Sequence, residues 1–223
     1  MGLLRELLAS KPVRTPLEFG INENIRFTAL SNEERKRDGE IIRRNNYMTF
    51  VKYDSEGNAL ANSEFSYMNL DNTSEYVWEN LIDQVTQMNK IAQTFNPDAS
   101  IDPTEGYEDL EELQKDLKTK PGCAKLLATM SEQFAAALEG KIGPDSMFIR
   151  LKIVTDTKTG KYLQLPKEAH VMEPMTEEKS TLNITAYEMK CKNKALEPAS
   201  LTADKKGDAP DTVVKKKSAL AGL

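Results

Sequence analysis

The segment 147–153 alternates strictly between apolar residues and an aromatic or charged residue, reading Met-Phe-Ile-Arg-Leu-Lys-Ile. Successive side chains of a β-strand point to opposite faces, so this pattern predicts a half-buried strand. One face would line a core with Met147, Ile149, Leu151 and Ile153. The other face would expose Phe148, Arg150 and Lys152, and an aromatic ring beside two cations suits a stacked nucleobase and its phosphate. The competing interpretation is an ordinary strand with a solvated outer face, since single surface aromatics are common.

Charge is distributed unevenly along the 223 residues, although the net charge of the whole chain is only −5. Residues 35–52 carry a net charge of +4 and residues 141–162 carry +3, whereas residues 75–139 carry −8. A uniformly basic nucleic-acid coat is therefore excluded, but two locally basic segments flank an acidic one. The acidic segment would repel DNA and could instead meet a basic partner.

Few residues are of the types that catalysis or metal binding requires. His170 is the single histidine and has no cysteine at a metal-ligand spacing. The sequence has no glycine-rich phosphate loop, no G-x-S-x-G elbow and no H-E-x-x-H motif. We expect no enzyme and no cofactor, and a carboxylate-only metal nuclease is the remaining catalytic alternative. Cys123 and Cys191 predict free thiols, and the lack of a long apolar run predicts a soluble, cytoplasmic protein.

The expected elements run from strands to helices and back to strands. Residues 25–30, 46–53 and 59–69 are predicted strands, and Gly57-Asn58 suits the turn between the second and third. Residues 31–44 are predicted to form a loop or a frayed helical turn. Apolar periodicity predicts helices at 77–95, 107–118 and 127–140, with Pro121-Gly122 ending the second. Further strands are expected at 147–153, 162–165 and 181–189.

This order predicts a mainly β, α+β domain with a helical insert. Specifically, we expect an OB-like five-stranded Greek-key barrel with an enlarged helical segment, about residues 71–140, between strands 3 and 4. The domain would span 19–195, with an N-terminal arm at 1–18 and a flexible tail at 196–223. Such barrels bind oligonucleotides on the face of strands 2 and 3 and through two loops, where this chain has basic and aromatic residues.

Two runs carry a resemblance to a known family. Residues 19–25 read Phe-Gly-Ile-Asn-Glu-Asn-Ile, and Leu-Lys-Ile-Val at 151–154 is followed by Gly-Lys-Tyr-Leu-Gln-Leu-Pro at 160–166. The first run resembles the opening of single-stranded-DNA-binding proteins of tailed bacteriophages, and the second resembles their second half. The resemblance covers about 19–189 and implies an OB-fold protein that coats replication or recombination intermediates in the host cell cytoplasm. Many such proteins end in an acidic tail, whereas this sequence has Lys215, Lys216 and Lys217 near its end.

Twelve aromatic or basic residues are candidates for nucleic-acid binding: Arg43, Arg44, Phe50, Lys52, Tyr53, Phe65, Tyr67, Phe148, Arg150, Lys152, Lys161 and Tyr162. Base stacking contributes about 1–3 kcal/mol per exposed aromatic, and arginine forks pair with phosphates. One face of strand 46–53 must be core, and the alternation leaves open which; we expect Phe50 and Lys52 to face the ligand. At least one of Phe65 and Tyr67 is expected in the core.

The expected function is sequence-tolerant binding and protection of single-stranded DNA during phage DNA replication or recombination. The alternative is a non-enzymatic structural or protein-interaction module, such as a virion component or recombination mediator, on the same barrel. Replication or recombination proteins are the expected protein partners, through the acidic insert or the C-terminal tail. Arg150→Glu with Lys152→Glu is expected to weaken DNA binding without unfolding the protein.

Overall fold

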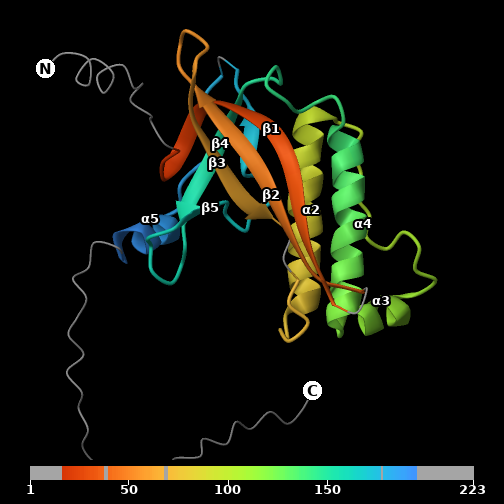
Figure 1. Cartoon of the computed structure of the whole chain (residues 1–223). Coiled ribbons are helices and arrows are strands. Elements are labelled where there is room, and N and C mark those ends of the chain that lie inside the picture. The colour runs from red at the N-terminus through yellow and green to blue at the C-terminus, as the bar shows by residue number, and fades with distance from the viewer. Residues whose placement is uncertain (1–16, 38–39, 68–69, 177, 195–223) are drawn as a thin grey trace, which may run out of the picture.

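An antiparallel sheet covered on one face by two long helices forms the body of the protein (Figure 1). The structure is a computed structural model and describes residues 17–37, 40–67, 70–176 and 178–194. The expected arm at 1–18 and the tail at 196–223 therefore lie almost entirely outside the described residues. The class is mixed: six strands and four helices occur in the described ranges.

The sheet has the order β3-β2-β1-β4-β5, and β6 also pairs with β4. Its strands are β1 (Gly20–Arg37), β2 (Glu40–Tyr53), β3 (Ala59–Tyr67), β4 (Ile149–Thr155), β5 (Leu163–Gln164) and β6 (Met172–Pro174). All the pairings are antiparallel. The sheet is open, with β3 at one end of the path and β5 at the other, so the described strands form no closed barrel.

The first two strands are much longer than expected. The sequence predicted a loop or frayed helical turn at 31–44, because that stretch is mostly polar and charged. Instead, β1 and β2 continue pairing through it, from Ser31 opposite Tyr47 to Arg37 opposite Glu40. The prediction was wrong because this stretch lacks the apolar alternation by which a strand is predicted.

The helices follow the third strand, as expected. α2 (Val77–Phe95) has the predicted bounds, and α3 (Leu110–Leu117) and α4 (Lys120–Leu138) follow. Pro121-Gly122 begins α4 rather than ending α3, since proline is tolerated in a first helical turn. A Cβ at Gly122 would collide with the backbone of Asp116, so the tight joint between α3 and α4 requires glycine there.

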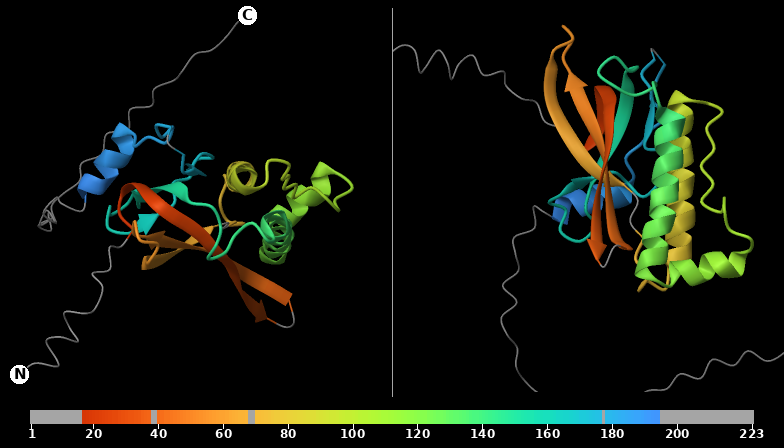
Figure 2. Two further views of the ribbon diagram at one scale, coloured as in Figure 1. Left: turned by 90° about the horizontal axis from the view of Figure 1, so that it is seen from above. Right: turned by 45° about the vertical axis from the view of Figure 1, so that its right-hand side comes forward.

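The core lies between the sheet and the pair α2 and α4, which run side by side against one face (Figures 1 and 2). Phe27 from β1 and Phe50 from β2 have ring centroids 4.9 Å apart, and Phe95 of α2 packs edge-on against Phe27. Tyr67 of β3 contacts Phe134 of α4, with ring centroids 5.4 Å apart. Trp78 is partly buried and packs against this core.

The prediction of a last strand at 181–189 is wrong. The chain there forms α5 (Ala186–Asn193), which begins with a capping box. Thr185 accepts a hydrogen bond from the backbone N–H of Glu188, whose carboxylate accepts one from the backbone N–H of Thr185. The Thr-x-x-Glu pattern that makes this cap is visible in the sequence and indicates the start of a helix, in conflict with the strand prediction.

Candidate nucleic-acid interface

Both faces of β4 are buried, which overturns the expected exposure of its charged face. Ile149, Leu151 and Ile153 are fully buried, as predicted, but Arg150 and Lys152 are only 7% and 1% exposed. Met147 was expected in the core and is instead exposed, because it precedes the strand. Helix α5 and the chain segment that follows β5 cover the face of β4 that the alternation assigned to solvent.

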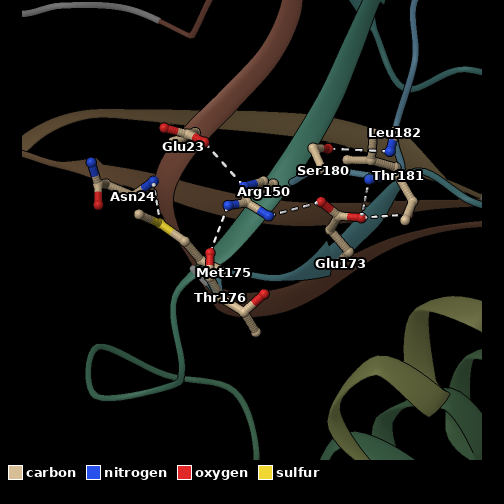
Figure 3. A network of polar contacts seen from close by, with 9 residues as sticks. All are labelled: Glu23, Asn24, Arg150, Glu173, Met175, Thr176, Ser180, Thr181 and Leu182. Atoms are coloured by element: carbon tan, nitrogen blue, oxygen red, sulfur yellow. Dashed lines mark hydrogen bonds and ion pairs between the residues drawn. The ribbon is translucent and has the colours of Figure 1, made fainter. Parts of the chain in front are cut away.

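Arg150 is held inside a network of polar contacts (Figure 3). Its Nε donates to Glu23 at 3.0 Å, one Nη donates to Glu173 at 3.2 Å, and the other donates to the carbonyl of Thr176 at 2.7 Å. Burial opposes ionisation of Glu173, but hydrogen bonds from Thr181, Ser180 and Arg150 outweigh it and lower the pKa of Glu173 to about 2. With these partners, Arg150 has a structural role and is not available to a phosphate at the surface.

Lys152, on the same face of β4, is also paired with carboxylates. Its Nζ lies 2.6 Å from a carboxylate oxygen of Glu168 and 3.0 Å from one of Glu188. Because Glu188 is also the capping residue of α5, Lys152 fixes that helix to the middle of β4. Charge reversal of Arg150 and Lys152 would set new carboxylates against the mostly buried ones of Glu173 and Glu188, so we expect it to destabilise the fold, contrary to the sequence prediction.

Three of the candidate aromatics belong to the core. Phe50, Phe65 and Tyr67 are 0%, 6% and 7% exposed, so they cannot stack on a base at the surface. The structure settles which face of β2 is inside: Met48 and Phe50 point to the helices, whereas alternate residues such as Tyr47 are partly exposed. The preference for Phe50 as a ligand-facing residue was wrong for this reason.

Phe148 and Tyr53 form a partly buried cluster with Arg26. The Arg26 guanidinium lies 4.3 Å from the ring centroid of Phe148 and 5.1 Å from that of Tyr53. Arg26 also donates to the carbonyl of Pro144 and lies 3.7 Å from Asp145. A cation of the chain itself therefore contacts both rings, and the cluster fixes the connection between α4 and β4.

The remaining candidates on the first strands are Lys52, Arg43 and Arg44, all of which lie on β2. Lys52 is half-buried near the end of β2, opposite Ile25 of β1. Arg43 and Arg44 lie on the long β1–β2 arm, with their Cα positions opposite Arg35 and Glu34. The side chains of both arginines are outside the described part of the chain.

The turn between β4 and β5 is rigid and presents cations. Asp156 accepts hydrogen bonds from the backbone N–H groups of Lys158, Thr159, Lys161 and Tyr162, at 2.6 to 3.1 Å. These bonds to Tyr162 and Thr159 hold the pKa of Asp156 far below its usual range. The turn reverses at Gly160, which has φ of +69°. Lys158 and Lys161 are exposed, and Tyr162 is 72% exposed.

Helix α5 lies beside this turn (Figure 1) and carries further lysines. Lys194, directly after the helix, donates to the carbonyl of Thr157 at 2.6 Å. On the helix itself, Tyr187 is 62% exposed, and Lys190 and Lys192 are also exposed. We call the following six residues the β5–α5 surface: Lys158, Lys161, Tyr162, Tyr187, Lys190 and Lys192.

Only Lys161 and Tyr162 of this surface were among the sequence candidates. Tyr187, Lys190 and Lys192 were missed because the sequence predicted no helix in their segment. Lys158 belongs to the basic segment 141–162 but was not a candidate. The signal that could have found the helical residues is the Thr185–Glu188 capping box, which predicts that Tyr187, Lys190 and Lys192 follow the start of a helix.

The described residues give no positive sign of metal chemistry. They contain no group of three or more His, Cys, Asp or Glu side chains placed to hold a metal ion. His170 is exposed in the loop before β6, and Cys123 and Cys191 are buried free thiols. Among the described helices, none is long and apolar enough to cross a membrane.

Comparisons with protein-family models, with curated proteins and with solved structures find no match to this chain.

Proposed function

We propose that this protein binds single-stranded DNA without strong sequence preference and protects it during phage DNA replication or recombination. The observation that carries the proposal is the β5–α5 surface, where exposed lysines and two largely exposed tyrosines lie on the β4–β5 turn and on helix α5, which Lys194 joins by its hydrogen bond to Thr157. Lysines neutralise phosphates, and tyrosine rings stack on bases of any identity. This combination is typical of proteins that bind single strands by their backbone and base faces.

The arrangement of the strands supports an OB-like origin for this surface. β1 lies between β2 and β4, and the helices fall between β3 and β4. OB-folds are partly open barrels that bind through the loop joining strands 1 and 2 and the loop joining strands 4 and 5. In this chain the second loop is the Asp156 turn, and the first is the β1–β2 arm that carries Arg43 and Arg44.

The charge of the surface is available to a ligand. Asp156 lies among the lysines, but four backbone N–H groups already surround its carboxylate. Glu188 of α5 is paired with Lys152 beneath the helix. The acidic residues nearest the lysines are thus satisfied internally, so the lysines favour an anionic ligand.

The test is a titration of the full chain with a labelled oligo-dT and with a duplex of equal length, at low and moderate salt. We expect tight binding to the single strand and weak binding to the duplex. For single strands, each phosphate that the protein neutralises should contribute about −0.7 to the slope of log K against log salt. No binding to either nucleic acid at low salt would contradict the proposal.

The surface is tested separately by charge reversal. Lys158→Glu with Lys161→Glu should weaken binding to oligo-dT and flatten its salt dependence. Lys115→Glu with Lys118→Glu is the matched control, because both residues are exposed at α3 and its C-terminal end, and the charge change is the same. Equal weakening by both pairs would show a general charge effect and remove the β5–α5 surface as the binding site.

A further inference from the structure

The two end strands of the open sheet border one hollow. A groove of about 680 Å³ lies between β3, the first half of α2 and the segment from β5 to Lys167. β3 is the last strand of the sheet path on one side, and β5 is the last on the other. The groove therefore lies where the sheet remains open, between its two end strands β3 and β5.

The lining of the groove is acidic with an apolar floor. Glu64, Asp71 and Asp83 contribute three carboxylates against the single cation of Lys167. Glu64 and Asp83 are exposed, whereas Phe65 and Leu165 are almost fully buried at its base. Such a groove repels a nucleic acid and suits an extended basic peptide with a few apolar side chains.

β3 supplies the backbone for such a peptide. It pairs only with β2 among the described strands, so its second edge is open. An open strand edge binds an extended segment through main-chain hydrogen bonds, while the flanking side chains select it. No lysine or proline within β3 blocks such pairing.

One segment of this chain has the matching chemistry. Residues 213–217 read Val-Val-Lys-Lys-Lys, so two β-branched residues that favour strands precede three positive charges. The 18 residues of 195–212 connect this segment to Lys194. A fully extended connection of that length spans roughly 60 Å, and it starts where Lys194 contacts Thr157, on the turn that leads into β5.

We propose that the segment 213–217 docks in the groove between β3 and β5 as an added strand, with its lysines facing Glu64 and Asp83. Docking completes the sheet edge that the described strands leave open. The inference does not depend on DNA binding, since it concerns the chain alone.

Negative charge alone does not distinguish the groove from other acidic surfaces that a basic segment could contact. The connection before α3 and the start of α3 are also acidic, with Glu108, Asp109 and Glu111 exposed. That surface has no open strand edge, however, and exposed ion pairs of this kind contribute only about 0–1 kcal/mol. The groove combines carboxylates with a strand edge and a buried apolar floor, so we expect docking there and not at α3.

The experiment uses the full chain with a nitroxide label at Ser218→Cys, next to the lysines. Labelling is selective because Cys123 and Cys191 are buried, and burial raises the pKa of the Cys123 thiol to about 11. We expect the amide NMR signals of residues 64–67, 163–165 and 167 to lose most of their intensity, while those of α3 keep theirs. Raising the salt to about 1 M, where the Debye length is about 3 Å, should restore the weakened signals.

The matched variants decide the result. Glu64→Lys with Asp83→Lys should restore the groove signals, whereas Glu111→Lys with Glu132→Lys, which changes exposed acids elsewhere, should not. Broadening that survives the groove variant, or that is concentrated at α3, would overturn the proposal. Broadening of the same signals in a mixture of nitroxide-labelled chains without isotope enrichment and isotope-enriched chains without nitroxide would overturn docking within one chain and show that a second copy supplies the strand.

Discussion

Lysines occur in two contrasting settings around β4. Lys152 in the strand is 1% exposed and lies between two carboxylates, whereas Lys158 and Lys161, a few residues later in the turn, are exposed. The first setting ties α5 to the sheet, and the second presents charge to solvent. The comparison teaches that the period of a strand predicts which residues share a face but not what covers that face.

The largest effect should come from removing the buried cation. Lys152→Ala leaves the carboxylates of Glu168 and Glu188 without their partner, and we expect the free energy of unfolding to fall by about 3–5 kcal/mol. Urea denaturation followed by circular dichroism measures it. The control is Lys161→Ala, which should change stability by less than about 0.5 kcal/mol. A similar small loss from both variants would mean that Lys152 is solvated in solution.

A second effect should follow pH through Glu173. The pKa of this residue is lowered from 4.5 to about 2 in the folded protein, so its contribution to stability is present above about pH 4.5 and is lost as the pH falls toward 2. The contribution should be about 3–4 kcal/mol, since one pKa unit corresponds to about 1.4 kcal/mol. Urea denaturation at several pH values, compared with Glu173→Gln, measures it. The stability gap between the two proteins should narrow as the pH falls, and a constant gap would argue against the Arg150–Glu173 network.

The helical layer and the alternating core of the sheet could be predicted because their apolar periods are long and regular. α2 begins and ends where the spacing of Val77 and Phe95 places it. Ile149, Leu151 and Ile153 lie in the core for the same reason. In these segments the local sequence alone determines which side chains are buried.

The binding candidates were less predictable because their exposure depends on segments far away in the sequence. Arg150 is buried by residues 173–181, and Lys152 is buried by Glu168 and Glu188, none of which a local pattern connects to β4. The same limit applies to the closure of the barrel. Whether β3 and β5 pair is decided by the twist and length of the whole sheet, and β5 is only two residues long.

A third effect concerns Tyr162, an exposed residue that follows the lysines of the β4–β5 turn. Tyr162→Ala should weaken binding to oligo-dT by about 1–3 kcal/mol, if its ring stacks on a base, and leave the unfolding free energy unchanged. Fluorescence anisotropy with labelled oligo-dT measures the affinity. Tyr76→Ala, at the start of α2, is the matched control, because this tyrosine is 61% exposed and lies outside the β5–α5 surface. Equal affinities for the two variants would leave the lysines alone as the binding groups.

The smallest effect concerns the start of α5, the helix that is tied to the buried Lys152. Thr185→Ala removes the side-chain cap of the helix and should lower the free energy of unfolding by about 1 kcal/mol. The backbone N–H of Glu188 loses its acceptor, whereas the Glu188 carboxylate keeps the backbone N–H of residue 185 and Lys152, so the helix should fray at its first turn while Cys191 remains buried. Hydrogen exchange measures this: the amides near Glu188 should lose protection before those of β4. Thr129→Ala on the side of α4 is a control, since Thr129 only donates to the carbonyl of Lys125 within its own helix. If α5 and β4 lost protection together, the helix would be an inseparable part of the core and not a cover laid over Lys152.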